Sequence, residues 1–262
     1  MGSATTQALA ASTQALAAAT GVTLDTAAEF FSVARSIEEA PQLSGALADP
    51  AAPATARAAL IATVFAHSSS VVREVLAVVV AQRWSNASDL IDGIEELAIR
   101  AASDSSETVD LEEELFEIAR IIATNSELEL ALGGRFGDGS VRAALIEKVL
   151  DGKTSAAARL IVSSLVRQPR GRRTRQMLDR AMRIVSAQRN RVVATVHTAQ
   201  LLTEAQSARL SDSLSRRYGA KVMLNQVIDP TVVGGLRVQI ADDVIDGSIS
   251  ARLADLRQKL AG

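Results

Sequence analysis

The spacing of apolar residues along the first 190 positions predicts a series of amphipathic α-helices. After Thr23, for example, Phe30, Val33 and Ile37 share one helical face, and Pro41 ends the pattern. The other predictions for this part are helices over 8–16, 58–65, 71–84, 90–99 and 177–185, a short apolar turn over 43–47, a proline loop over 49–53 and a linker over 103–106.

The period changes from helical to alternating near position 190. Val192, Ala194 and Val196 predict a strand, and Thr203-Glu-Ala-Gln206 has the capping-box spacing that opens a helix. Gly219 is expected to end that helix. The remaining predictions are strands over 222–227, 236–241 and 244–245, a turn at 242–243, and a last helix that begins at Ser248 and places Ile249, Leu253, Leu256 and Leu260 on one face.

The helical part repeats itself at an offset of 85 residues. This shift places Phe31-Ser-Val-Ala-Arg35 on Phe116-Glu-Ile-Ala-Arg120, and Arg57-Ala-Ala-Leu-Ile61 on Arg142-Ala-Ala-Leu-Ile146. We infer a duplicated helical unit, whose second copy has no evident counterpart of the first helix. The expected fold is mainly α with a small C-terminal α/β domain, in three parts: an N-terminal helical bundle at 1–105, a second helical bundle at 106–190 and a strand-rich module with two helices at 191–262.

Composition agrees with a closely packed helical protein. Apolar residues make up 48% of the 262 residues and aromatic residues only 3%. The chain has no cysteine, which excludes disulfides and thiolate metal sites. The most apolar run, 75–81, is too short to cross a bilayer, and the first six residues lack the features of a signal peptide. We therefore expect a soluble protein without direct membrane insertion.

The net charge of −2 conceals a polar distribution of charge. Residues 1–130 hold 19 acidic and 6 basic side chains, a balance of −13, whereas the remainder holds 11 acidic and 22 basic ones, a balance of +11. Such an asymmetry suggests different partners for the two halves. The arginine run Arg167–Arg183 raises one alternative function, a helical regulatory protein that binds nucleic acid. Stacking aromatic residues and a recognition motif are missing there, so protein contact or solvation is favoured.

Other stretches imitate chemistry without its full pattern. The glycine-rich segment 133–140 follows no predicted strand and lacks the lysine of a phosphate-binding loop, so a surface connector is favoured. Asp242, Asp243 and Asp246 lack the calcium-loop spacing. His67 and His197 fall in different predicted domains, with no serine–histidine–acid arrangement. We predict no catalytic, cofactor or metal site, and no enzymatic activity of the chain itself.

The segment 221–260 carries the most specific pattern in the chain. Asp229-Pro230, Gly234-Gly235, Asp246-Gly247-Ser248 and a helix with Leu253 and Leu256 follow one another at fixed offsets. This order resembles the C-terminal signature of the ATP synthase delta subunit family, whose mitochondrial member is the oligomycin-sensitivity-conferring protein. These residues are expected to shape the backbone, because glycine and proline restrict or permit particular turns.

The resemblance implies a non-catalytic stator subunit in the peripheral stalk of a proton-translocating ATP synthase, at the cytoplasmic face of the cell membrane. In that family the first and fifth helices hold the N-terminal segments of the alpha subunits, and the C-terminal domain grips the C-terminal ends of the b subunits. No nucleic acid or cofactor is implied. By position, the alpha-subunit contacts correspond here to Leu9, Leu16, Val71, Val75, Val78 and Val79. The second bundle departs from the family pattern.

Overall fold

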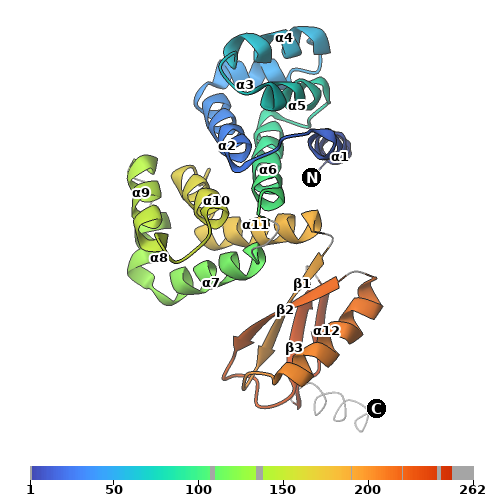
Figure 1. The fold of residues 1–262 in the computed structure, drawn as a ribbon, viewed down its shortest axis with the longest axis vertical. Helices are drawn as coiled ribbons and strands as arrows, with labels where there is room; N and C mark the ends of the chain where they lie inside the picture. The colour runs from blue at the N-terminus through green and yellow to red at the C-terminus, as the bar shows by residue number, and fades with distance from the viewer. Residues whose placement is uncertain are drawn as a thin grey trace, which may run out of the picture. The chain divides into compact units, whose positions relative to one another are not determined.

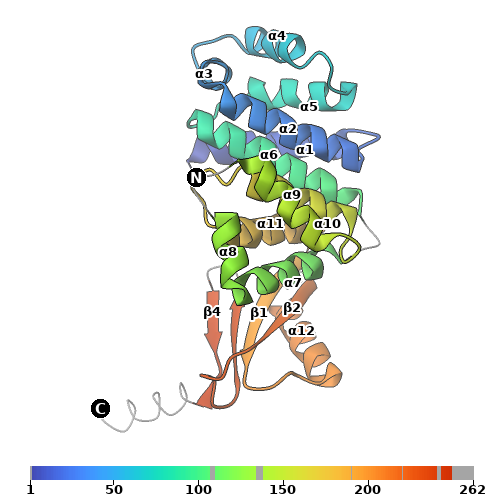
Figure 2. The ribbon, with the colours of Figure 1, turned by 90° about the vertical axis from the view of Figure 1, so that its left-hand side faces the viewer.

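The structure is a computed structural model that describes residues 2–106, 110–133, 138–189, 191–219, 221–240 and 243–249. The chain forms two compact units, Met1–Val185 and Ser186–Gly262. The first is helical and the second contains a small sheet (Figures 1 and 2). The predicted class, mainly α with a small C-terminal α/β domain, is confirmed. The predicted division of the helical part at residue 105 stays a prediction.

Six helices precede residue 105: α1 (Ser3–Ala18), α2 (Leu24–Glu39), α3 (Pro41–Ala48), α4 (Ala54–Val64), α5 (Ser70–Ala81) and α6 (Ala87–Asp104). Thr23 caps α2 in a reciprocal capping box with Thr26, and Ser69 caps α5. Two predictions are corrected. The expected turn over 43–47 is the helix α3, because Pro41 suits the first helical turn as well as it ends the previous helix. The expected linker begins too early, since α6 continues to Asp104.

Five more helices complete the first unit: α7 (Leu111–Thr124), α8 (Ser126–Gly133), α9 (Gly139–Leu150), α10 (Ala156–Arg167) and α11 (Thr174–Gln188). The repeat extends to polar contacts. Glu29 accepts a hydrogen bond from the backbone N–H of Ser69 at 2.7 Å, and Glu114 accepts one from that of Ser155 at 2.8 Å. The second copy is therefore built as the first one is, with an offset of 85 residues that grows to 86 at α10.

The helix α6 belongs to both copies. Shifted by 85 residues, α1 falls on 88–103, which lies within α6. In the first copy α1 contacts α5, and in the second copy α6 contacts α10. The expectation that the second copy has no counterpart of the first helix is therefore corrected: α6 ends one copy and begins the next. One continuous hydrophobic core runs through both copies.

The second unit contains β1 (Arg191–Thr198), α12 (Glu204–Tyr218), β2 (Lys221–Ile228), β3 (Leu236–Ile240) and β4 (Asp243–Asp246). The strands form one sheet in the order β2-β1-β3-β4, with β1 parallel to β2 and the other pairs antiparallel. The helix α12 packs on this sheet (Figure 1). Its core consists of Ala194, Val196, Leu214, Val222, Val238 and Ile240.

The sequence-based elements of this unit agree well with the structure. Thr203 and Gln206 form the predicted capping box, and Gly219 ends α12 with a φ of 68°. Asp243 differs from expectation, because it belongs to β4 and not to a turn. The predicted final helix, with Leu253, lies outside the described residues beyond Ile249.

Candidate partner-binding surfaces

The predicted alpha-subunit contacts divide into buried and accessible residues. Leu16, Val75 and Val79 are at most 2% exposed, because α5 is covered by both α1 and α6. They are core residues, so their assignment to a surface is corrected. Leu9, Val71 and Val78 remain half-buried on α1 and α5. We call these three residues the α1–α5 surface (Figure 1 shows the two helices).

The helix α1 is fixed in place by a polar anchor at its start. The hydroxyl of Thr5 is fully buried, donates to the carboxylate of Asp89 and lies 2.8 Å from the hydroxyl oxygen of Ser85. Ala8 and Leu16 then bury one side of α1 against the core. The α1–α5 surface is thus an apolar strip between two helices whose relative position is set by packing and by hydrogen bonds.

The arginine run faces the carboxylates of α2 and α6. Arg170 bridges Glu38 at 3.0 Å and Asp92 at 2.6 Å, and donates to the hydroxyl of Ser88 at 2.7 Å. Its side chain is only 9% exposed. Burial raises the pKa of Glu38 above its ordinary value of 4.5, while Arg170 lowers it. The loop between α10 and α11 is therefore joined to the first copy by charged hydrogen bonds, which are stronger than neutral ones.

Two more arginines converge on α6. Arg172 and Arg180 both donate to Glu95, and Arg180 also lies 3.4 Å from Glu96. We call this set, with Arg170, Glu38 and Asp92, the inter-copy ion-pair cluster. Since three of the seven arginines are engaged by carboxylates of the same chain, the run is not a continuous basic face. The sequence argument for nucleic-acid binding loses its main support.

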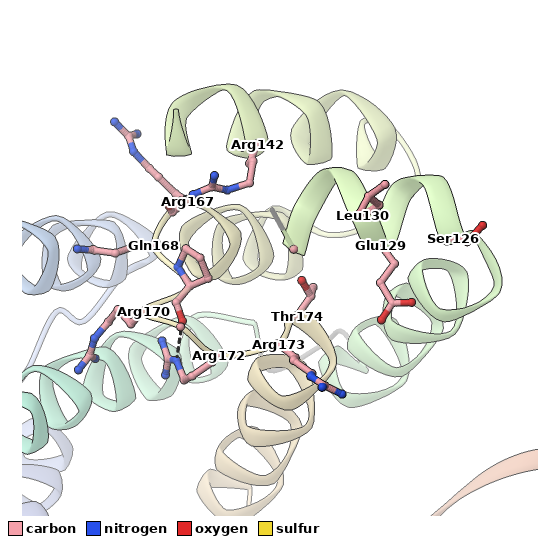
Figure 3. Close-up of a pocket in the computed structure, with 13 residues that line it drawn as sticks. Ser126, Glu129, Leu130, Arg142, Arg167, Gln168, Arg170, Arg172, Arg173 and Thr174 are labelled. Atoms are coloured by element: carbon pink, nitrogen blue, oxygen red, sulfur yellow. Dashed lines mark hydrogen bonds between the residues drawn. The ribbon is translucent and has the colours of Figure 1, made fainter. Parts of the chain in front are cut away.

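The exposed arginines of the run do not converge on a common site. A hollow of about 860 Å³ lies between α8 and the loop from Arg167 to Thr174. Figure 3 shows Arg167 and Arg173 extending in opposite directions from it. Arg142, also at its wall, donates to the carbonyl oxygen of Val166 at 3.0 Å. The guanidinium groups therefore do not form an anion-binding cradle.

The signature residues of the second unit close a pair of adjoining loops. The N–H of Gly247 donates to the carbonyl of Leu236 at 2.9 Å, and that of Ile249 donates to the carbonyl of Gly234 at 3.0 Å. Gly235 has a φ of 79°, and a Cβ there would lie 2.5 Å from the carbonyl oxygen of Gly247. Only glycine meets both conditions, so Gly235 is required by geometry.

Two aspartates of the signature stabilise these loops. Asp229 accepts from the N–H and the hydroxyl of Thr231, at 2.9 and 2.6 Å, and these bonds lower its pKa. Asp246 accepts from the N–H of Ser248 at 2.9 Å, and this bond likewise lowers the pKa of Asp246. Both are turn residues of the kind that bond their own backbone two positions on. Pro230 is exposed beside Asp229.

The stretches that imitate chemistry are placed apart or serve the backbone. Asp138 caps α9 by accepting from the N–H of Ser140 at 2.8 Å, whereas 134–137 lie outside the described residues. His67 is exposed after α4, and His197 lies in β1 of the other unit. Across the described ranges, no group of three or more histidine or acidic side chains is arranged to hold a metal ion. No helix in those ranges combines the length and apolarity that a membrane span needs.

Sequence signals could have found some of these contacts. Asp92, Glu95 and Glu96 are spaced so that they share one face of α6. A set of acidic residues on a helix with an apolar opposite face, together with an arginine run in the same chain, is the signal of an internal ion-pair cluster. The burial of Val75 and Val79 has no such signal, because α5 is apolar on most sides.

Comparison with known proteins identifies the family. Residues 98–260 match the model of the ATP synthase delta (OSCP) subunit family, and this match begins inside α6. The ATP synthase subunit delta of Leifsonia xyli subsp. xyli is 45% identical over 264 residues, covering all of both chains. That of Nocardia farcinica is 38% identical and covers 92% of this chain and 91% of its own. That of Streptomyces avermitilis is 36% identical, with 89% and 87% covered.

The family match and the full-length relatives agree with the duplicated architecture. The matched residues correspond to the second copy together with the sheet-containing unit, and the relatives extend the similarity over the first copy. Because the match covers more than half of the chain, the chain belongs to the ATP synthase delta (OSCP) subunit family, whose members are non-catalytic components of the peripheral stalk of ATP synthase.

Proposed function

We propose that this chain links the catalytic head of ATP synthase to its b subunits and resists the torque of rotation. The α1–α5 surface would receive an N-terminal segment of an alpha subunit. The Ser186–Gly262 unit would hold the C-terminal ends of the b subunits. The observation that carries the proposal is the family membership of the whole chain, with the head-binding positions of the family at Leu9, Val71 and Val78 still accessible.

A stator needs stiffness and durable contacts, and no reacting group. The continuous core of the helical unit supplies stiffness, since close-packed interiors deform little. A half-buried strip of Leu9, Val71 and Val78 suits an amphipathic helix, because apolar anchors in a groove drive such binding. Localisation follows from the proposal: the chain would be peripheral, at the cytoplasmic face of the cell membrane, through its complex.

Binding of the head can be tested with one substitution. Val78→Glu places a charge on the α1–α5 surface and should weaken binding of an alpha-subunit N-terminal peptide at least about tenfold, because an unpaired carboxylate would be desolvated. Val64→Glu is the matched control, since Val64 is 47% exposed on α4. Far-ultraviolet circular dichroism should be unchanged in both. Equal binding by both variants would refute this contact.

The role of the second unit can be tested by deletion of residues 191–262. The truncated chain should remain helical and still bind the alpha-subunit peptide, because the contact clusters separate near Val185. Its capture of b subunits should be lost. Trp84, the only tryptophan, is 4% exposed, so its fluorescence reports whether the helical unit stays folded. A folded truncated chain that captured b subunits with full affinity would show that the helices hold them.

A further inference from the structure

The two copies present equivalent surfaces with different neighbours. The offsets of 85 residues for α1 and 86 for α5 carry the three positions of the α1–α5 surface to Ile94 and Ala157, on α6 and α10, and to Ser164. Ile94 is fully buried and Ala157 is 2% exposed, although their counterparts in the first copy are half-buried. Something covers this surface in the second copy that is missing from the first among the described residues.

The helix that covers it is α2. It contacts both α6 and α10, which is the relation of a helix lying along the groove between them. Its apolar face, with Phe30, Val33 and Ile37 at most 2% exposed, is turned into the core. At its end, Glu38 bonds the Nε of Arg170 at 3.0 Å, so the loop that follows α10 holds the C-terminal turn of α2.

We propose that α2 occupies, in the second copy, the groove that stays open to a partner helix on the α1–α5 surface. This inference rests on the proposed function of that surface. It implies that the duplication does not create a second head-binding site. The chain offers one such site, on the first copy, and the second copy serves as a rigid spacer between that site and the sheet-containing unit.

The inter-copy ion-pair cluster makes this arrangement selective. A partner helix could enter the second groove only by displacing α2, which would expose its apolar face to water and remove a carboxylate from Arg170. Each of these changes carries a cost, since burial of apolar side chains and of paired charges would both be lost. The internal helix is moreover present at a high effective concentration, because it is part of the same chain.

The test uses the full chain and a synthetic alpha-subunit N-terminal peptide in isothermal titration calorimetry. We expect one peptide per chain. Val78→Glu should weaken binding at least about tenfold, whereas Ser164→Glu, at the equivalent position of the second copy, should leave affinity and stoichiometry unchanged. Two peptides per chain, or a loss caused by Ser164→Glu and not by Val78→Glu, would overturn the inference.

Hydrogen exchange covers the case in which Ser164→Glu disturbs folding. In the unmodified chain the peptide should slow amide exchange in α1 and α5 and leave α6 and α10 unchanged. Slowing in α10 would instead place the peptide in the second groove and refute the inference. Absence of any binding to the unmodified chain would have a different meaning, because it would refute the proposed function of the α1–α5 surface as well.

Discussion

Arg172 and Glu95 form a two-pronged ion pair, in which the Nη1–Oε1 and Nη2–Oε2 distances are both 2.7 Å. The Glu95 side chain is 8% exposed and also accepts from Arg180 at 2.8 Å. One carboxylate on the shared helix α6 therefore holds two arginines of the second copy. Flat, bidentate contact of this kind restricts orientation as well as distance.

Glu95→Ala should destabilise the helical unit by about 3 kcal/mol, because it leaves Arg172 and Arg180 beside a desolvated gap. This figure is at the lower end for buried pairs, since the two arginine side chains are 23% and 20% exposed. Urea unfolding followed by Trp84 fluorescence measures the change.

The control for this prediction is Glu117→Ala. Glu117 pairs with Arg120 on the outside of α7, where the side chains of the two residues are 43% and 62% exposed. Exposed pairs contribute about 0.5 kcal/mol, so stability should hardly change. Similar losses in both variants would mean that the inter-copy ion-pair cluster does not hold the copies together.

The repeat predicts a matched pair of variants at Arg57 and Arg142. Arg57 is 7% exposed and donates to the carbonyl oxygens of Gln82 and Ala81, at 3.1 and 3.5 Å, at the end of α5. Arg142 makes the corresponding bonds at the end of α10. Arg57→Leu should cost about 2 kcal/mol in urea unfolding, because two carbonyls lose a charged donor.

Arg142→Leu tests whether the two copies use this contact alike. It should destabilise the helical unit in the same direction but by less, because Arg142 is only half-buried. Hydrogen exchange should show faster opening of α10 in this variant and of α5 in Arg57→Leu. If only one of the two substitutions had an effect, the copies would share a sequence pattern without sharing its energetic role.

Much of the local structure could be predicted because it depends on neighbouring residues. The capping box of Thr23 involves a side chain three positions away, and Gly219 ends α12 through its own φ of 68°. Alternation likewise predicted β1 to β3. The helix α3 was missed because eight residues are too few to show a helical period, and Pro41 is compatible with either the end or the start of a helix.

The candidate site depended more on contacts between distant segments. Arg170 and Asp92 are 78 positions apart, and nothing in the local pattern of either predicts their pairing. Val75 and Val78 are both apolar residues of one apolar helix, yet only Val75 is covered by the core. Which side of such a helix is covered depends on its packing partners, and these are decided by the fold as a whole.

Gly235 and Gly219 allow a comparison in the sheet-containing unit. Both have positive φ, 79° and 68°, but a Cβ would meet the Gly247 carbonyl oxygen at 2.5 Å only at Gly235. Gly219→Ala should cost about 1 kcal/mol through backbone strain. Gly235→Ala should cost about 3 kcal/mol, because the loops must also separate. Amide exchange in β1 and β3 measures both, and equal effects would contradict a required close approach at Gly235.

The pKa of Asp246 gives this unit a dependence on pH. The backbone N–H of Ser248 favours the ionised carboxylate and holds the pKa of Asp246 below its ordinary value of 3.8. A group with a lowered pKa in the folded state stabilises that state above its unfolded pKa, and loses the contribution as the pH falls through the folded one. The stabilisation from Asp246 should therefore be complete above about pH 5 and disappear well below pH 4.

Asp246→Asn should remove this contribution while keeping an oxygen near Ser248. We expect amide exchange at the loop of Gly247 and Ser248 to be faster in the variant at pH 6, and the difference from the unmodified chain to vanish near pH 2. Asp212→Asn, on the exposed face of α12, should behave like the unmodified chain at both pH values. A difference between Asp246→Asn and the unmodified chain that persisted unchanged at pH 2 would show that the substitution acts through shape, and not through the charge that accepts the Ser248 bond.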